Sequence, residues 1–461
     1  MRDCRSFVDE CIGNDRAVYG ATTGFGPLVG FAGRDEAADQ CDNALQHLTA
    51  GQGPDLPLPV VRAAVLARTW SLARGHGGVA PEVIDRLCEM LATSFTPAVP
   101  TLGSVGASGD LIPLAYIAQS LRGRGHAYVD GMRMSAEQAL ATAGLTPLQL
   151  DGRDALGLVN GTSLTAAAAG LAWSSVRRSH AGIVATTALL ADLLGCTPAF
   201  LEPALLTAYG HPEAAAVGAR ISARLAGVSP SGDRPLQEPY SIRCTPQLLG
   251  AAESALGYVG TVVTNDLNGI SDNPLFFPED GLVAHGGNFF GQPCAFVADL
   301  LTVVTAQLGN LLERQLDLLV DPARNTGLPP MLSTAPGRQH AVQGVQLAST
   351  AIVASMRRAA TPASAQSLPT NLHNQDVVPF GTQAALTALE SAASLKLLLG
   401  SLALALRQAV HVGARRPTAA PCAALFDELA ASIAPITQDR PLDVDVRTAA
   451  DIVEQHVREP G

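Results

Sequence analysis

The chain has 461 residues, of which 47% are hydrophobic and 15% charged, so it is long enough for a buried core and too apolar to be disordered. Its 30 basic and 41 acidic residues give a formal net charge of −11, and Lys396 is the single lysine. This balance excludes the basic patch of a nucleic-acid-binding protein. Aromatic residues make up 4% of the chain, so Ala, Leu and Val supply most of the apolar surface, which favours helix over strand.

Several site classes are excluded by missing patterns. The eight cysteines form no C-x-x-C pair, and the first residues lack a signal-peptide core, so we expect a cytoplasmic protein. The ten histidines show neither H-x-x-x-H nor H-E-x-x-H spacing, and we expect no metal site. Neither a G-x-x-x-x-G-K-[ST] loop nor a G-x-S-x-G motif occurs, so we expect no nucleotide cofactor and no serine-hydrolase nucleophile.

In chain order, residues 1–154 are broken by Gly and Pro and predict a compact, irregular N-terminal domain. The clearest helix in it is expected at Pro81–Thr93, where apolar residues recur at helical spacing. Residues 155–461 predict a second domain built as a bundle of long helices, with the clearest helices at Leu156–Val184, Phe296–Val320 and Ala384–Val412. Loops rich in Gly and Pro are expected between them, at Ser229–Pro246, Ser271–Pro293 and Thr361–Gly381.

The apolar helix surface suggests association between copies of the chain. It exceeds what one slender bundle normally hides, so we expect a homo-oligomer. The charge-free stretch Ala155–Val176 has the length of a membrane span, but its Asn, Thr and Ser residues would be costly in lipid. We interpret it as a buried helix and expect no membrane association.

One segment can undergo an unusual backbone reaction. It is Ala107-Ser108-Gly109, which is followed by Asp110 and an apolar helix pattern. A simple interpretation is a glycine-rich turn in which Ser108 or Asp110 caps the next helix. In a tight turn, however, the Gly109 nitrogen can attack the Ala107 carbonyl, since glycine has no Cβ to obstruct the approach. Two dehydrations, the second removing the Ser108 hydroxyl, would leave a methylidene-imidazolone (MIO), an electrophile made from the chain itself.

Six further motifs occur around this tripeptide in one order along the chain. They are Val18-Tyr19-Gly20-Ala21-Thr22-Thr23-Gly24-Phe25-Gly26, Asn160-Gly161-Thr162, Gln237-Glu238-Pro239-Tyr240-Ser241-Ile242-Arg243-Cys244, Ser271-Asp272-Asn273-Pro274-Leu275, Gly287-Asn288-Phe289 and Asn374-Gln375-Asp376-Val377. Together with Ala107-Ser108-Gly109 they resemble the aromatic amino-acid ammonia-lyase and aminomutase family. The resemblance implies a mainly α, fumarase/aspartase-like architecture and MIO as the cofactor.

The resemblance also implies roles for individual residues. Tyr19 would take the β-proton of an aromatic amino acid, and Arg243 would bind its carboxylate. Tyr240 and Asn160 would hold the cofactor, amine or carboxylate, Gln237 and Gln375 would orient them, and Phe289 would pack near the ring. Taken singly, Tyr19 could be a loop tyrosine, Arg243 a surface ion pair and Asn160 a satisfied helix breaker. By resemblance the protein is a homotetramer whose active sites each draw on three subunits.

Substrate choice depends on fewer residues. His47-Leu48 matches the form of the selectivity motif found in tyrosine-acting members of the family, and Asn371 also resembles the tyrosine type. A histidine can hydrogen-bond a para-hydroxyl that would otherwise be buried unpaired. We expect tyrosine or a ring-modified tyrosine as substrate, with phenylalanine or histidine as alternatives; a structural His47 in the core is the competing interpretation.

The type of reaction is less closely defined by these residues. Lyases and aminomutases of the family share these residues. An inactive homologue that acts as a scaffold or regulator is one alternative. A fumarase/aspartase-type lyase, which eliminates without MIO, is another, but its serine-loop signature is not visible in the sequence. Only 18 residues precede Tyr19, fewer than is usual in the family, which would leave its loop looser if an N-terminal element is missing. The chain also departs from the family pattern at Ala21, Phe290 and Pro379-Phe380, near the expected pocket.

Overall fold

The protein is mainly α-helical, as the composition predicts. The computed structural model describes residues 1–14, 16–33 and 37–458. The described residues form seventeen α-helices and three small antiparallel sheets, with strand orders β1-β3, β2-β4-β5 and β6-β7.

The chain divides into two compact units that interleave in sequence. The first contains residues 1–171, 260–299 and 362–387, and the second contains residues 172–259, 300–361 and 388–461. Four long helices therefore contribute residues to both units. The expected domains, 1–154 and 155–461, are two consecutive segments of the chain rather than interleaved ones. That division stays a prediction.

The first unit contains most of the short elements. Its helices and strands are α1 (Arg2–Gly13), α2 (Ala37–Leu45), β1 (Gln52–Asp55), α3 (Leu58–Ala73), α4 (Pro81–Ala92), β2 (Thr96–Pro97), β3 (Pro100–Leu102), α5 (Leu111–Leu121), β4 (His126–Val129), β5 (Met132–Ser135), α6 (Ala136–Thr142), α7 (Gly152–Val159), β6 (Leu275–Phe277) and β7 (Leu282–Ala284). The expected helix at Pro81–Thr93 is confirmed as α4, whose buried Val83, Leu87 and Met90 form its inner stripe.

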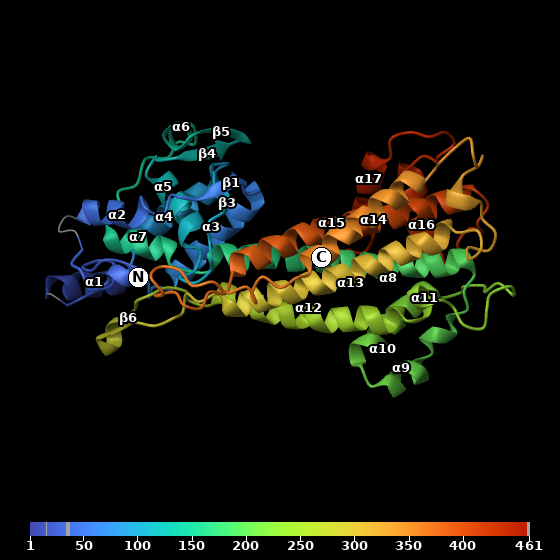
Figure 1. Ribbon diagram of the computed structural model, residues 1–461, viewed down its shortest axis with the longest axis horizontal. Coiled ribbons are helices and arrows are strands. Elements are labelled where there is room, and N and C mark those ends of the chain that lie inside the picture. Colours follow the sequence, from blue (N-terminus) through green and yellow to red (C-terminus); the bar gives the residue numbers. More distant parts are fainter. Residues whose placement is uncertain (15, 34–36, 459–461) are drawn as a thin grey trace. The chain divides into compact units, whose positions relative to one another are not determined.

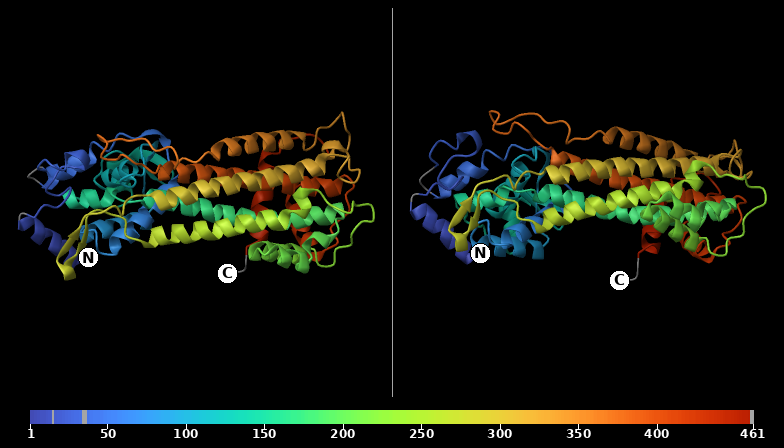
Figure 2. Two further views of the ribbon diagram at one scale, coloured as in Figure 1. Left: turned by 60° about the horizontal axis from the view of Figure 1, so that its bottom comes forward. Right: turned by 90° about the horizontal axis from the view of Figure 1, so that it is seen from below.

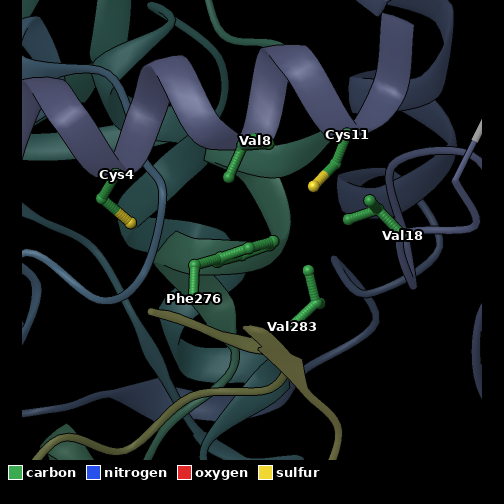
Figure 3. Packing of buried hydrophobic residues seen from close by; sticks show 6 residues of the cluster. All are labelled: Cys4, Val8, Cys11, Val18, Phe276 and Val283. Carbon is green, nitrogen blue, oxygen red and sulfur yellow. The ribbon is translucent and has the colours of Figure 1, made fainter. Parts of the chain in front are cut away.

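Helix α1 anchors the chain just before Tyr19. Its Cys4, Val8 and Cys11 point toward Phe276 on β6 and Val283 on β7, and Val18 completes this buried cluster (Figure 3). Because Val18 directly precedes Tyr19, the loop that carries the tyrosine is held by α1 and by the β6-β7 hairpin. Val18 thus fixes the start of this loop, and the looser loop considered from the short leading segment stays a prediction.

The second unit is built on long helices. Its main elements are the greater parts of α8 (Ser163–Leu194), α12 (Thr245–Asn268), α13 (Gln292–Val320) and α15 (Gly381–His411), together with α9 (Pro203–Tyr209), α10 (Pro212–Arg224), α11 (Tyr240–Arg243), α14 (Gln343–Ala359), α16 (Ala420–Ser432) and α17 (Asp443–His456). The four long helices run side by side in this unit (Figures 1 and 2). Glycines permit close approach at Gly182, where a Cβ would meet Leu399, and at Gly309, where it would meet Leu398.

The predicted long helices are correct in two of three cases. Phe296–Val320 and Ala384–Val412 correspond to α13 and α15. The helix expected at Leu156–Val184 is wrong as one element, because α7 ends at Val159 and α8 begins at Ser163. Asn160-Gly161-Thr162 forms the break, and the apolar pattern on both sides does not reveal it.

Helices α13 and α15 are also long and apolar enough to cross a membrane, judged by length and composition alone. Their most apolar windows are 61% and 67% buried inside the protein, however, as in core helices of soluble proteins. This feature is therefore weak evidence for a membrane span.

Candidate functional site

The tripeptide Ala107-Ser108-Gly109 forms a tight turn in the first unit. Backbone bridges join Gly109 to Gly106, to Ala107 and to Gly161. Gly109 has φ +71°, and a Cβ there would overlap the backbone of Gly161, so no other residue fits this position without displacing that segment. The turn therefore brings the Gly109 backbone close to the Ala107 backbone.

A buried carboxyl group lies directly below the turn. Asp110 is fully buried, and its oxygens accept hydrogen bonds from the Thr165 backbone N–H at 2.9 Å and from the hydroxyls of Thr165, Thr382 and Ser104 at 2.8, 2.6 and 3.2 Å. Burial raises the pKa of Asp110, while these hydrogen bonds act in the opposite direction. Asp110 precedes α5 but makes no side-chain cap there. The expected capping role is thus corrected: its carboxyl caps the first turn of α8.

Four helices begin at the turn. Helix α5 follows Asp110 directly, and α8 begins beside it through Thr165. The residue before α13, Gly291, donates its N–H to the Gly106 carbonyl at 3.4 Å, and the residue before α15, Phe380, donates to Val105 at 3.0 Å. Since helix N-termini carry partial positive charge, this arrangement favours negative charge near the turn.

A cavity of about 790 Å³ opens above Ser108 and Gly109, entirely within the first unit. Nine of the expected site residues line it: Tyr19, His47, Leu48, Ser108, Gly109, Asn160, Phe289, Asn371 and Gln375. Ala107 is buried beneath it against Val378 and Phe380. Residues from six separate parts of the sequence thus meet at one cavity.

Tyr19 is partly buried at the cavity wall. Its hydroxyl oxygen accepts a hydrogen bond from the Gly26 backbone N–H at 2.7 Å. Burial raises the pKa of Tyr19, and the Gly26 hydrogen bond offsets this in part. The ring of Phe25 stands edge-on to Tyr19, with centroids 6.3 Å apart, and also lies 6.2 Å from the ring of His47. Phe25 therefore links the two side chains, a contact that sequence reasoning missed.

His47 has a defined tautomer. Its Nδ1 lies 2.8 Å from the Asn43 carbonyl oxygen, four residues earlier. Because a carbonyl can only accept, Nδ1 carries a proton, and in the neutral imidazole Nε2 is then the acceptor. His47 is exposed rather than part of the core, which excludes the competing interpretation.

Two amide side chains approach the turn. The Gln375 amide nitrogen donates to the Ser108 Oγ at 2.8 Å. The Asn160 amide nitrogen donates to the Asn273 carbonyl at 2.9 Å, while its buried Oδ1 has no partner among the described residues. That oxygen is an unused acceptor at the cavity.

Three expected site residues belong to the second unit. Gln237 and Tyr240 are exposed, and the Arg243 guanidinium lies over the Tyr240 ring at 4.7 Å. The Nε of Arg243 is buried and lacks a partner in the described part of the chain. The structure therefore places Arg243 with Tyr240, and these residues do not line the cavity of the first unit.

The departures from the family pattern have separate positions. Phe380 packs against Ala107, whereas Ala21 packs against the α1 cluster. Asn43, Val105 and Asn374 also line the cavity and were not predicted as site residues. Asn374 begins the motif that contains Gln375, whereas no motif contains Asn43 or Val105.

The chain is similar to known proteins over almost its whole length. Residues 1–431 match the family described as aromatic amino acid lyase. A tyrosine ammonia-lyase of Cereibacter sphaeroides is 40% identical over 461 aligned positions (94% of this chain, 88% of that protein), and a histidine ammonia-lyase of Roseobacter denitrificans is 35% identical (98% and 90%). The solved structure of a tyrosine aminomutase from Streptomyces globisporus has a TM-score of 0.92 at 30% identity, covering 98% of this chain and 90% of that one. This chain belongs to the aromatic amino acid lyase family and is an aromatic amino-acid ammonia-lyase or the related aminomutase.

Proposed function

We propose that the chain converts Ala107-Ser108-Gly109 into MIO and acts on tyrosine or a ring-modified tyrosine. The observation that supports this most strongly is that Ser108, Tyr19 and His47 line one cavity. The proposal assigns the cofactor to one end of the cavity and selection of the aromatic ring to His47.

The residues around the turn fit this cofactor. Gly109 has a positive φ and no Cβ to obstruct the approach of its nitrogen to the Ala107 carbonyl, and Gln375 donates a hydrogen bond to the hydroxyl of Ser108. Asn160 Oδ1 offers an unpaired acceptor at the same place. Once formed, MIO supplies an electrophile for the amino group of the substrate.

Tyr19 would remove the β-proton. Because burial raises the pKa of its phenol, the phenolate needs further stabilisation beyond the Gly26 N–H. The four helix N-termini at the turn would supply part of it, and we propose that Arg243 of a neighbouring subunit, binding the substrate carboxylate, adds a positive charge. Gln237 and Tyr240 would accompany Arg243.

The tautomer of His47 supports a phenolic substrate. Its Nε2 can accept a hydrogen bond, and the para-hydroxyl of tyrosine is a donor. Phenylalanine would leave Nε2 without this partner. Leu48 and Asn371 would complete the ring pocket, with Phe289 against the ring.

The substrate assignment is tested by measuring kcat/KM for tyrosine, phenylalanine and histidine with one preparation. We expect tyrosine to give the highest value. Histidine is the second candidate, because one of the similar proteins is named a histidine ammonia-lyase. A clear preference for histidine would overturn the tyrosine assignment.

Product analysis separates the two reactions of the family. Release of p-coumarate with free ammonia identifies a lyase, and β-tyrosine identifies an aminomutase. We further propose a cytoplasmic homotetramer in which each active site combines residues of three subunits, without metal, nucleotide or nucleic acid.

A further inference from the structure

We propose that Arg68 is a positioning residue for the conversion of Ala107-Ser108-Gly109 into MIO. The inference rests on the proposed function, since it concerns how that cofactor forms. Arg68 lies on α3 and does not itself line the cavity, but it bonds to the backbone of Asn160, which does. It would therefore act through the segment between α7 and α8.

The guanidinium of Arg68 joins two loops. It is 2% exposed and donates to the carbonyls of Gly157 (Nε, 2.9 Å), Asn160 (Nη2, 3.1 Å) and Ser271 (Nη1, 2.7 Å). Gly157 lies in the last turn of α7 and Asn160 just beyond it, where carbonyls have no partner within the helix. Arg68 therefore fixes the end of α7 to the loop at Ser271.

The held segment touches the turn itself. A Cβ at Gly161 would overlap Arg68 Nη1, and a Cβ at Gly109 would overlap the Gly161 backbone. The Asp110 N–H donates to the Gly161 carbonyl at 2.7 Å. The guanidinium, Gly161 and Gly109 are thus in successive contact, and a shift of the guanidinium moves the backbone that supports Gly109.

An arginine suits this buried position because it keeps its charge there and because its shape matches the three carbonyls. Asp272 pairs with Arg153 and lies 3.9 Å from Arg68, so the three buried groups carry one net positive charge. Burial lowers the pKa of Arg68 to about 10, which leaves it protonated at neutral pH. Its planar fork can serve three carbonyls in fixed directions, whereas a lysine ammonium cannot match that geometry.

Ring closure depends on this support. A bond forms between the Gly109 nitrogen and the Ala107 carbonyl carbon. The Ala107 oxygen then leaves as water with the amide hydrogens of Gly109 and Ser108, and a C=N bond forms between the Ala107 carbon and the Ser108 nitrogen. The Ser108 hydroxyl then leaves as a second water with the Cα hydrogen of Ser108, which creates the methylidene bond. No oxidant is needed, so the rate depends on how closely Gly109 is held to Ala107.

The test compares Arg68→Met and Arg68→Lys with Arg62→Met in the full-length protein. Arg62 is a matched control, because it lies on the same helix and donates to three backbone carbonyls, those of Leu91, Thr93 and Phe95, at 2.7, 2.9 and 3.2 Å. The readouts are the intact mass, which falls by about 36 Da on conversion, and the mass of the tryptic peptide spanning residues 87–122. Circular dichroism and the melting temperature report folding separately.

We expect Arg68→Met to keep its helix content but to show at least a tenfold smaller converted fraction shortly after synthesis. Arg62→Met should be destabilised yet fully converted. If Arg68→Met does not fold, Arg68→Lys carries the test and should convert more slowly than the wild type. Full conversion in the folded Arg68 variants, or equal loss in Arg62→Met, would overturn the inference. An unconverted wild type would instead refute the proposed function.

Discussion

At the residue scale, the hydrogen bond between His47 and the Asn43 carbonyl has a direct consequence for substrate choice. It leaves Nε2 of the neutral ring as an acceptor. A phenol hydroxyl can donate a hydrogen bond to this nitrogen, whereas an unsubstituted phenyl ring cannot. Selectivity would then depend on one donor-acceptor pair.

Replacing His47 by Phe tests this pair. We expect kcat/KM for tyrosine to fall about 2- to 13-fold, the equivalent of about 0.5–1.5 kcal/mol for one lost hydrogen bond, while phenylalanine is turned over as well or better. Gln46→Ala, at the exposed neighbouring position, should leave the ratio of the two substrates unchanged. An unchanged ratio in His47→Phe would show that His47 does not select the ring.

Several site residues were predictable from the sequence because their chemical types occur together in motifs. Tyr19, His47, Asn160 and Gln375 belong to this group, and the structure brings them to one cavity. Arg68 and the contacts of Phe25 were not predictable in this way, although Phe25 lies in the same motif as Tyr19. Their roles depend on contacts with residues 22 and 203 positions away, Phe25 with His47 and Arg68 with Ser271, which no local pattern encodes.

At the scale of elements, α7 positions Asn160 and is held at its start by a capping box. Asp151 and Asp154 bond reciprocally to the backbone, and Arg5 of α1 forms ion pairs with both. Burial, followed by the nearby Asp151 charge, raises the pKa of Asp154 to about 6. Folded protein therefore binds a proton between pH 4 and pH 6 that the unfolded chain has lost.

It follows that the contribution of Asp154 to stability decreases as pH rises from about 4 to about 6. Each pH unit changes it by at most about 1.4 kcal/mol. We expect the melting temperature of the wild type minus that of Asp154→Asn to decrease over this window and to level off above it. A difference that grows with pH would mean that Arg5 lowers the pKa of Asp154 below its ordinary value.

The sequence predicts long helices well only where apolar spacing is continuous and unbroken. Helix α12 was missed because Gly250, Gly257 and Gly260 interrupt its pattern, although Gly250 is needed where α10 approaches: a Cβ there would overlap Ala214. The break at Asn160-Gly161-Thr162 was overlooked because the apolar pattern continues on both sides of it. Its cause is tertiary, since Arg68 and Ser271 satisfy the backbone groups that a continuous helix would pair internally.

At the scale of the whole molecule, large apolar side chains remain exposed on several helices. They include Trp70 at 53%, Tyr258 at 57%, Phe296 at 59% and Leu347 at 66% exposure. Such surface supports the expected association of subunits. The sequence predicts association from the amount of apolar helix surface, but not which faces meet, because that depends on complementary shape.

Shared active sites can be tested by complementation. Tyr19→Phe and Arg243→Ala should each lose at least 100-fold in kcat when each variant is expressed alone. If the two residues of one site come from different subunits, co-expression should restore about a quarter of wild-type activity, since each residue is intact with a probability of about one half. Separately purified and then mixed variants provide the control. No recovery on co-expression would place Tyr19 and Arg243 of each site in the same subunit.

The central claim is that the chain makes its own electrophile, and intact-mass measurement tests it most directly. Wild-type protein should be about 36 Da lighter than its sequence, and Ser108→Ala should have the full mass of its own sequence. A wild-type protein at its full sequence mass would contradict the account.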